Sequence, residues 1–196
     1  MKDNKISTKD RLLDSAYKEI YKYGFQGCSV DRILKDAKVP KGSMYHHYKS
    51  KKELALGVIN ERISPAMLIF FSFENTKGND EIEKLENKVI EMSELTLSLK
   101  FGCPMNKLVR EMFSLDLEFK QQLDTTYKKI LNKIETFLEQ AIQNKTIQKC
   151  DTHSLSLFIY TTILGNISIG EGNITKESFL SSISHLFTYL KSLKSK

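Results

Sequence analysis

Hydrophobic residues in this chain recur mainly at steps of three and four positions, the spacing that places them on one face of an α-helix. No run of alternating polar and β-branched residues is long enough to predict a strand. Only three prolines and nine glycines interrupt the 196 residues, so long stretches favour helix. The pattern predicts an all-α fold of about nine helices.

The first part of the pattern predicts three short helices. Gly24 ends the first, over residues 8–23, because glycine readily adopts the left-handed conformation needed there. Ser29 is a candidate N-cap for the second helix, and residues 38–39 form a short turn before the third. Pro40 suits the first position of that third helix. This order predicts a helix-turn-helix.

A capping signal, Ser50 followed by Glu53, starts a fourth helix that Pro65 kinks or breaks. The chain thus divides into a head, residues 1–50, and a larger helical body, residues 51–196. The further helices expected in the body cover about residues 80–99, a segment from Pro104, and about residues 117–144, 152–170 and 176–194.

Positive charge is concentrated in the head. Residues 1–60 hold 13 Lys and Arg against 7 Asp and Glu, whereas residues 61–196 hold 17 of each. A positive excess confined to one small part of a protein indicates a polyanionic partner. The alternative is a lysine-rich segment that only keeps the protein soluble.

The predicted third helix has few large apolar side chains and many hydrogen-bond donors. Met44, Tyr45 and Tyr48 are too few for a core helix, so most of its surface is expected to face a partner. The backbone N–H groups at its start suit an anion such as phosphate, and Gly42 removes bulk there. Donors suited to phosphates and base edges are Lys41, Tyr45, His46, His47, Lys51 and Lys52.

The segment from Ser29 to Leu54 resembles the DNA-binding segment of the TetR family of transcriptional repressors. The run from Lys41 to Tyr48 carries most of this resemblance. Two positions depart from the family pattern. Most members have glycine where Lys38 stands, and a non-glycine residue in a left-handed turn costs roughly 1 kcal/mol. Many members have serine or threonine at Pro40, which cannot provide a side-chain cap.

The resemblance implies a DNA-binding domain over residues 1–50 and an effector-binding and dimerisation domain over residues 51–196, with no cofactor. A homodimer would place two reading helices in successive major grooves of a palindromic operator on double-stranded DNA. We expect Lys41, Gly42, Ser43 and His46 nearest the base edges, and Ser29, Tyr45, His47 and Lys51 at phosphates.

A Gly-Cys-Pro sequence at residues 102–104 also occurs in a branch of the TetR family. Cys103 precedes a predicted helix start, where unpaired N–H groups favour a reactive thiolate, and Lys100 and Lys107 lie near it in sequence. Some members sense oxidants or electrophiles through a cysteine. The alternative is a buried, inert residue at a helix start.

Aromatic and methionine side chains are frequent in the body and are typical of a broad apolar ligand pocket, although any helical core also uses them. A small apolar or amphipathic effector bound there would oppose operator binding. The residues expected to line the pocket are Phe71, Met92, Phe101, Cys103, Met105, Met112, Phe113, Tyr127 and Phe158.

The helices predicted over residues 152–170 and 176–194 have apolar stripes suited to a four-helix dimer interface. On the first of them, Phe158, Tyr160, Leu164 and Ile169 lie off the main stripe, so the apolar surface is wider than one contact needs. Packing within a single chain is the alternative.

The sequence contains no glycine-rich phosphate loop, no histidine and carboxylate cluster at zinc spacing and no Gly-x-Ser-x-Gly. Three cysteines, with no signal segment and no apolar stretch long enough to span a membrane, predict a cytoplasmic protein without metal or enzymatic activity. Two alternatives are a small-molecule carrier or enzyme on a helical bundle, and an adaptor whose basic head binds an acidic protein.

Overall fold

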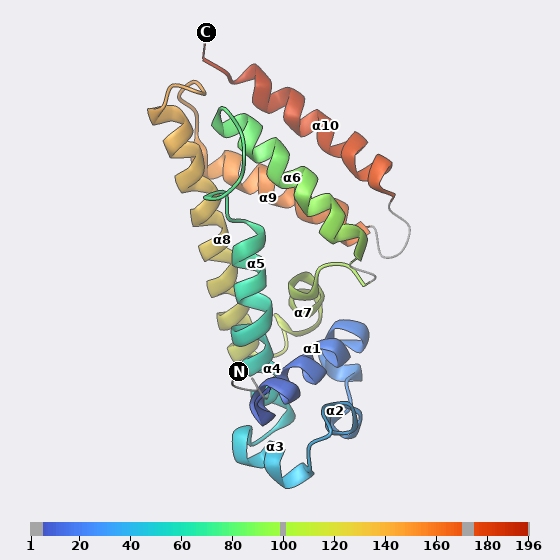
Figure 1. Ribbon diagram of the computed structural model, residues 1–196. Helices are drawn as coiled ribbons and strands as arrows, with labels where there is room; N and C mark the ends of the chain where they lie inside the picture. The colour runs from blue at the N-terminus through green and yellow to red at the C-terminus, as the bar shows by residue number, and fades with distance from the viewer. Residues whose placement is uncertain (1–5, 99–100, 170–174, 196) are drawn as a thin grey trace, which may run out of the picture. The chain divides into compact units, whose positions relative to one another are not determined.

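The computed structural model describes residues 6–98, 101–169 and 175–195, and these form helices without a strand (Figure 1). The predicted all-α fold is therefore confirmed. The helices are α1 Thr8–Gly27, α2 Val30–Ala37, α3 Lys41–His47, α4 Lys51–Val58, a π-helical turn Ile59–Ile63, α5 Ser64–Phe70, α6 Glu81–Ser98, α7 Pro104–Met112, α8 Leu117–Gln143, α9 Thr152–Ile169 and α10 Lys176–Ser192. The expected helix ends at residues 99 and 170 and the side chain of Lys100 lie outside the described residues.

The chain forms two compact units. The first comprises Met1–Met67 with Pro104–Thr126, and the second Leu68–Cys103 with Tyr127–Lys196. The first unit thus includes α4 and α7 beside the three helices of the predicted head. Compactness does not decide which residues bind DNA or an effector, so the functional division at residue 50 stays a prediction.

In the first unit, α1 buries one apolar face against α2 and α4. Leu12, Leu13 and Ala16 on this face are fully buried. Gly24 has φ 75°, as expected for a helix end, but the chain resumes helix for one more turn to Gly27. A Cβ on Gly24 would lie 2.6 Å from a carboxylate oxygen of Glu111, so a side chain here would displace that carboxylate and would also be strained by the positive φ.

Two side chains of α7 hold the end of α1. The Glu111 carboxylate accepts hydrogen bonds from the backbone N–H groups of Phe25 at 2.7 Å and Gln26 at 2.6 Å. The Lys107 ammonium donates to the carbonyl oxygens of Tyr21 and Lys22, each at 3.1 Å. Carboxylate and ammonium thus bind backbone groups that a helix end leaves without helical partners.

Pro65 does not break the fourth helix. The π-helical turn Ile59–Ile63 leads directly into α5, which contains Pro65 and continues to Phe70. In that turn the N–H of Ser64 donates to the carbonyl of Ile59, five residues back. This wider turn accommodates the residue that has no N–H to donate.

In the second unit, α10 packs against α6 and α9 (Figure 1). The core of this unit includes Leu85, Ile134, Ile159, Ile163 and Ile183, all nearly or fully buried. None of the described helices is long and apolar enough to cross a membrane.

Candidate nucleic-acid interface

The third helix, α3, buries only one of its seven side chains. Met44 is fully buried, whereas Tyr45 is 47% exposed. Lys41, Gly42, His46 and His47 are exposed and Ser43 is half-buried. The structure thus brings six of the predicted DNA-binding residues together on one short helix, held by a single apolar anchor.

The turn before α3 adopts the conformation that the family pattern requires, despite the lysine. Lys38 has φ 53° and ψ 48°, and the N–H of Val39 donates to the carbonyl of Leu34 at 3.1 Å. Arg11 on α1 also donates to the carbonyl of Ala37 at 3.2 Å. These bonds offset the roughly 1 kcal/mol cost of a left-handed non-glycine residue. The contact from Arg11 had no signal in the sequence.

The sequence suggested Pro40 as the first helical residue, and the structure corrects this. Its ψ of 148° is extended, so it is the N-cap, and α3 begins at Lys41 without a side-chain cap. The N–H of Ser43 donates to the carbonyl of Pro40 at 3.0 Å. This N–H group is therefore not among those at the start of α3 that can face an anion. A Cβ on Gly42 would meet no heavy atom within 4 Å, so packing within the chain does not require glycine there.

Ser29 and Lys51 belong to the helices that precede and follow α3 in the chain, at the starts of α2 and α4. Ser29 is the N-cap of α2, and its hydroxyl accepts from the N–H of Arg32 at 3.4 Å. The Lys51 ammonium donates to the carbonyl of Gln26 at 3.2 Å and lies 4.8 Å from the ring centroid of Phe25. Both side chains therefore have structural contacts as well as the predicted phosphate contacts, which stay predictions.

Ser50 caps α4 by accepting from the N–H of Glu53 at 3.0 Å. The Glu53 carboxylate reaches back to the N–H of Lys49 at 2.7 Å, one residue before the one that a capping box would use. These bonds fix where the chain leaves α3.

Four lysines between residues 35 and 49 keep their positive charge uncompensated. Lys35, Lys38, Lys41 and Lys49 are exposed, and none forms an ion pair with another described residue. By contrast, Lys52 pairs with Asp116 at 2.7 Å and with Glu118 at 2.9 Å. Several uncompensated lysines in one short segment attract polyanions, although an isolated lysine carries little information.

Three of the predicted effector residues gather in the second unit. The Tyr160 ring lies 5.4 Å from the Phe71 ring and 5.2 Å from the Tyr127 ring, measured between centroids. Burial, together with nearby Cys103 and Tyr127, raises the pKa of Tyr160. Tyr160 belongs to this cluster and not to a surface stripe, which periodicity alone could not reveal.

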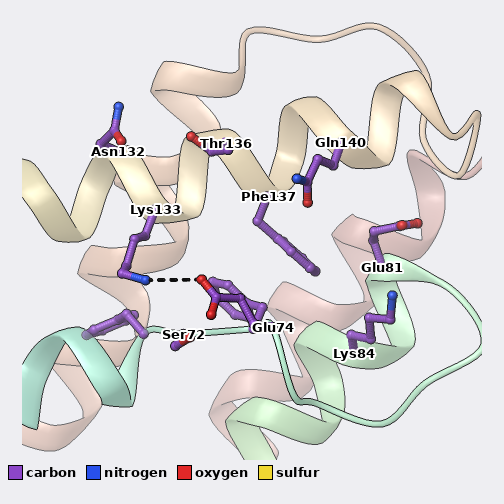
Figure 2. Close-up of a pocket in the computed structure, with 11 residues that line it drawn as sticks. Ser72, Glu74, Glu81, Lys84, Asn132, Lys133, Thr136, Phe137 and Gln140 are labelled. Atoms are coloured by element: carbon purple, nitrogen blue, oxygen red, sulfur yellow. Dashed lines mark ion pairs between the residues drawn. The ribbon is translucent and has the colours of Figure 1, made fainter.

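The other predicted effector residues do not join one pocket. Met92 is fully buried, Phe101 is half-buried, and Phe158 is 45% exposed beside Tyr189. Met105, Met112 and Phe113 belong to the first compact unit. Of the nine predicted residues, only Phe71 lines the cleft of about 360 Å³ that Figure 2 shows.

Leu164, like Tyr160, was expected to be available to a partner helix but is buried within its own chain. The exposed large apolar residues of α9 and α10 within the described ranges are Leu157, Phe158 and Tyr189. Gly165 has open space around its Cβ position. Over the described residues, no group of three histidine, cysteine or acidic side chains is suited to a metal ion.

Comparison with known proteins identifies regulators of transcription. Residues 12–58 match the family described as "Bacterial regulatory proteins, tetR family". A helix-turn-helix transcriptional regulator of Lactococcus lactis is 27% identical over 133 residues, 67% of this chain and 68% of that protein. The repressor NemR of Escherichia coli K12 is 22% identical over 76% of each chain. A TetR regulator from Chloroflexus aurantiacus has the same fold, with a TM-score of 0.80, 19% identity and coverage of 95% and 96%.

Proposed function

We propose that this chain, whose residues 12–58 match the tetR family of regulatory proteins, acts as a transcriptional repressor which a small molecule releases from a palindromic operator. The single observation that carries this proposal is α3, which carries six predicted contact residues, five exposed and Ser43 half-buried, and buries only Met44. A helix that contributes one anchor to the core and carries an exposed lysine and two exposed histidines is suited to a major groove.

We assign base edges to Lys41, Gly42, Ser43 and His46, and phosphates to Ser29, Tyr45, His47 and Lys51. Lys41 and His46 are exposed and project from the reading helix itself, so they can reach bases. Lys51 lies outside α3 at the start of α4, where it suits the DNA backbone.

The operator is expected to be two-fold symmetric because the protein is proposed to act as a homodimer. The exposed Leu157, Phe158 and Tyr189 on α9 and α10 suit an apolar contact between copies. The open space at Gly165 allows a partner helix to approach closely. Two reading helices would then enter major grooves roughly 34 Å apart.

Release by an effector requires that the effector and the operator favour different conformations, so that each weakens binding of the other. The body is proposed to bind this effector, and the protein to act without a cofactor or catalysis. Cys103 is 4% exposed, which favours its structural interpretation over a redox sensor. Continued release of DNA by electrophiles after Cys103→Ser would exclude a sensing role for this thiol.

A gel-shift titration tests the proposal directly. The full-length protein is titrated onto the promoter fragment upstream of its own gene at several salt concentrations. We expect sequence-specific binding that weakens by roughly a thousandfold or more between 50 and 200 mM salt, because several phosphates are neutralised. Lipophilic cations, quinones and acyl compounds are then added as candidate effectors. Equal affinity for unrelated DNA under all conditions would contradict the proposal.

Two lysine substitutions separate the proposed roles. Lys51→Ala should weaken binding to all sequences alike and reduce the salt slope by about 1. Lys41→Ala should also change which sequence is preferred, and it should leave folding intact because Lys41 is exposed and unpaired within the described residues. Lys129→Ala, an exposed lysine on α8, is the matched control.

A further inference from the structure

A cleft of about 360 Å³ lies within the second compact unit. It shares Phe71 with the aromatic cluster described above, but Tyr127 and Tyr160 do not line it. Residues 71–74, the start of α6 and one side of α8 line it (Figure 2). Its volume lies within the range of roughly 300 to 1,000 Å³ that is usual for small-molecule sites. The cleft is therefore large enough for a compact ligand.

Aromatic rings form the apolar part of this cleft. The Phe73 and Phe137 rings stack with centroids 4.3 Å apart and an angle of 24° between their planes. They are 6% and 8% exposed, and Phe71 is fully buried. Such rings favour a flat aromatic ligand in an offset or edge-on arrangement.

The acidic residues of the cleft already have partners. Glu81 is 8% exposed, and its two carboxylate oxygens accept hydrogen bonds from Asn144 and Thr146. Glu74 is 80% exposed and lies 3.7 Å from the Lys133 ammonium, as Figure 2 shows. An exposed pair at this distance contributes little, so a ligand can replace it.

The basic residues have unused hydrogen-bonding capacity. Lys84 is half-buried and forms no hydrogen bond or ion pair with a described residue through its side chain. Its charge nevertheless acts on Glu81: against the effect of burial, hydrogen bonds from Thr146 and Asn144 and the nearby Lys84 lower the pKa of that carboxyl. Lys133 makes only the weak pair with Glu74 among the described residues. Thr136 and Gln140 add polar groups from α8 on the same side (Figure 2). The donors that remain are therefore mainly cationic, and an anion bound there competes with Glu74 for Lys133 and with Glu81 for Lys84.

We propose that this cleft binds a small aromatic carboxylate and that this ligand is the effector. The ligand's ring contacts Phe73 and Phe137, and its carboxylate takes the ammonium groups of Lys84 and Lys133. This inference rests on the proposed function for the consequence of binding, but the binding itself does not depend on DNA.

Isothermal titration calorimetry on the full-length protein tests the ligand class, with benzoate as the probe. Benzamide removes the charge, benzylammonium reverses it, and cyclohexanecarboxylate removes the aromatic ring. We expect saturable binding of benzoate and at least about tenfold weaker binding of each of the other three. Equal or tighter binding of benzylammonium would overturn the inference, as would the absence of benzoate binding.

Lys84→Gln tests the location of the site. The substitution should weaken benzoate binding by at least about tenfold, since a charge-assisted hydrogen bond is lost. Lys129→Gln, which changes an exposed lysine of α8 outside the cleft, should leave affinity unchanged. Thermal unfolding of both variants checks that they fold. Unchanged affinity in a folded Lys84→Gln variant would place the site elsewhere and overturn the inference.

A gel shift with and without benzoate separates this inference from the proposed function. Specific DNA binding that benzoate weakens supports both. Specific DNA binding by a protein that does not bind benzoate overturns the inference alone. Benzoate binding by a protein that shows no specific DNA binding overturns the proposed function and the effector role, while the ligand site stands.

Discussion

Helices α1 and α3 of the first compact unit differ in how they are held. On α1, a buried apolar face is supplemented by side-chain contacts along its length, including Arg62 with Asp10 at 2.8 Å and with Asp14 at 2.7 Å. α3 has one buried side chain and no side-chain cap. We infer from this difference that α1 stabilises the unit, whereas α3 leaves most of its groups available to a partner. Substitution of an exposed side chain of α3 should therefore lower DNA affinity with little change in stability.

Met44→Ala should have the largest effect, because it removes the only buried side chain of α3. Truncating a buried methionine typically costs about 2 to 5 kcal/mol, so we expect a marked loss in the free energy of unfolding together with loss of DNA binding. Urea denaturation measures the first and a gel shift the second. Tyr45→Ala is the matched control on the exposed side, and it should lose DNA affinity with little change in stability. A stable Met44→Ala variant would contradict the single-anchor description of α3.

Glu111→Ala should have the next largest effect, because Glu111 holds the end of α1. It leaves the N–H groups of Phe25 and Gln26 without their carboxylate acceptor. We expect a loss of about 1 to 3 kcal/mol in the free energy of unfolding. Glu118→Ala is a suitable control, because this glutamate is exposed and its partner Lys52 keeps a second ion pair, with Asp116, after the substitution. Equal stability of the two variants would show that the end of α1 does not depend on this carboxylate.

Gly42→Ala should move stability and DNA affinity in opposite directions. Because the added Cβ meets no atom within 4 Å and the position is helical, alanine should stabilise the unit by up to about 1 kcal/mol. The same methyl group would obstruct the close approach of DNA to the start of α3, so affinity should fall. Thermal unfolding and a gel shift on one preparation measure both. Unchanged affinity would remove Gly42 from the reading surface.

The same contrast explains which parts the sequence could predict. The α3 motif, the caps at Ser29 and Ser50 and the left-handed Lys38 follow from residues close together in the chain. The contact of Glu111 with Phe25 and Gln26 joins residues about 86 positions apart, and no local pattern reports it.

The body was harder to predict for a related reason. Its cleft combines residues between Phe71 and Gln140, and many of them are polar. The effector residues predicted from apolar side chains include core residues such as Met92, which do not line this cleft, and their role in binding an effector stays a prediction. Helical periodicity identifies which residues face inward, but it does not distinguish a filled core from a hollow one.

Tyr48→Phe should have the smallest effect. It tests whether Tyr48, the residue after α3, only anchors this helix or also contacts DNA. Tyr48 follows α3, is 6% exposed, and its hydroxyl is buried without a hydrogen-bond partner among the described residues. Burial, with a smaller contribution from Glu61, raises its pKa to about 12. Removing an unsatisfied buried hydroxyl should leave stability unchanged or raise it by up to about 1 kcal/mol. DNA affinity should not change, because the hydroxyl is buried beside Gly57 and cannot reach a phosphate. A fall in affinity without a fall in stability would mean that Tyr48 belongs to the reading surface, and that α3 and the residue after it act as one unit in binding DNA.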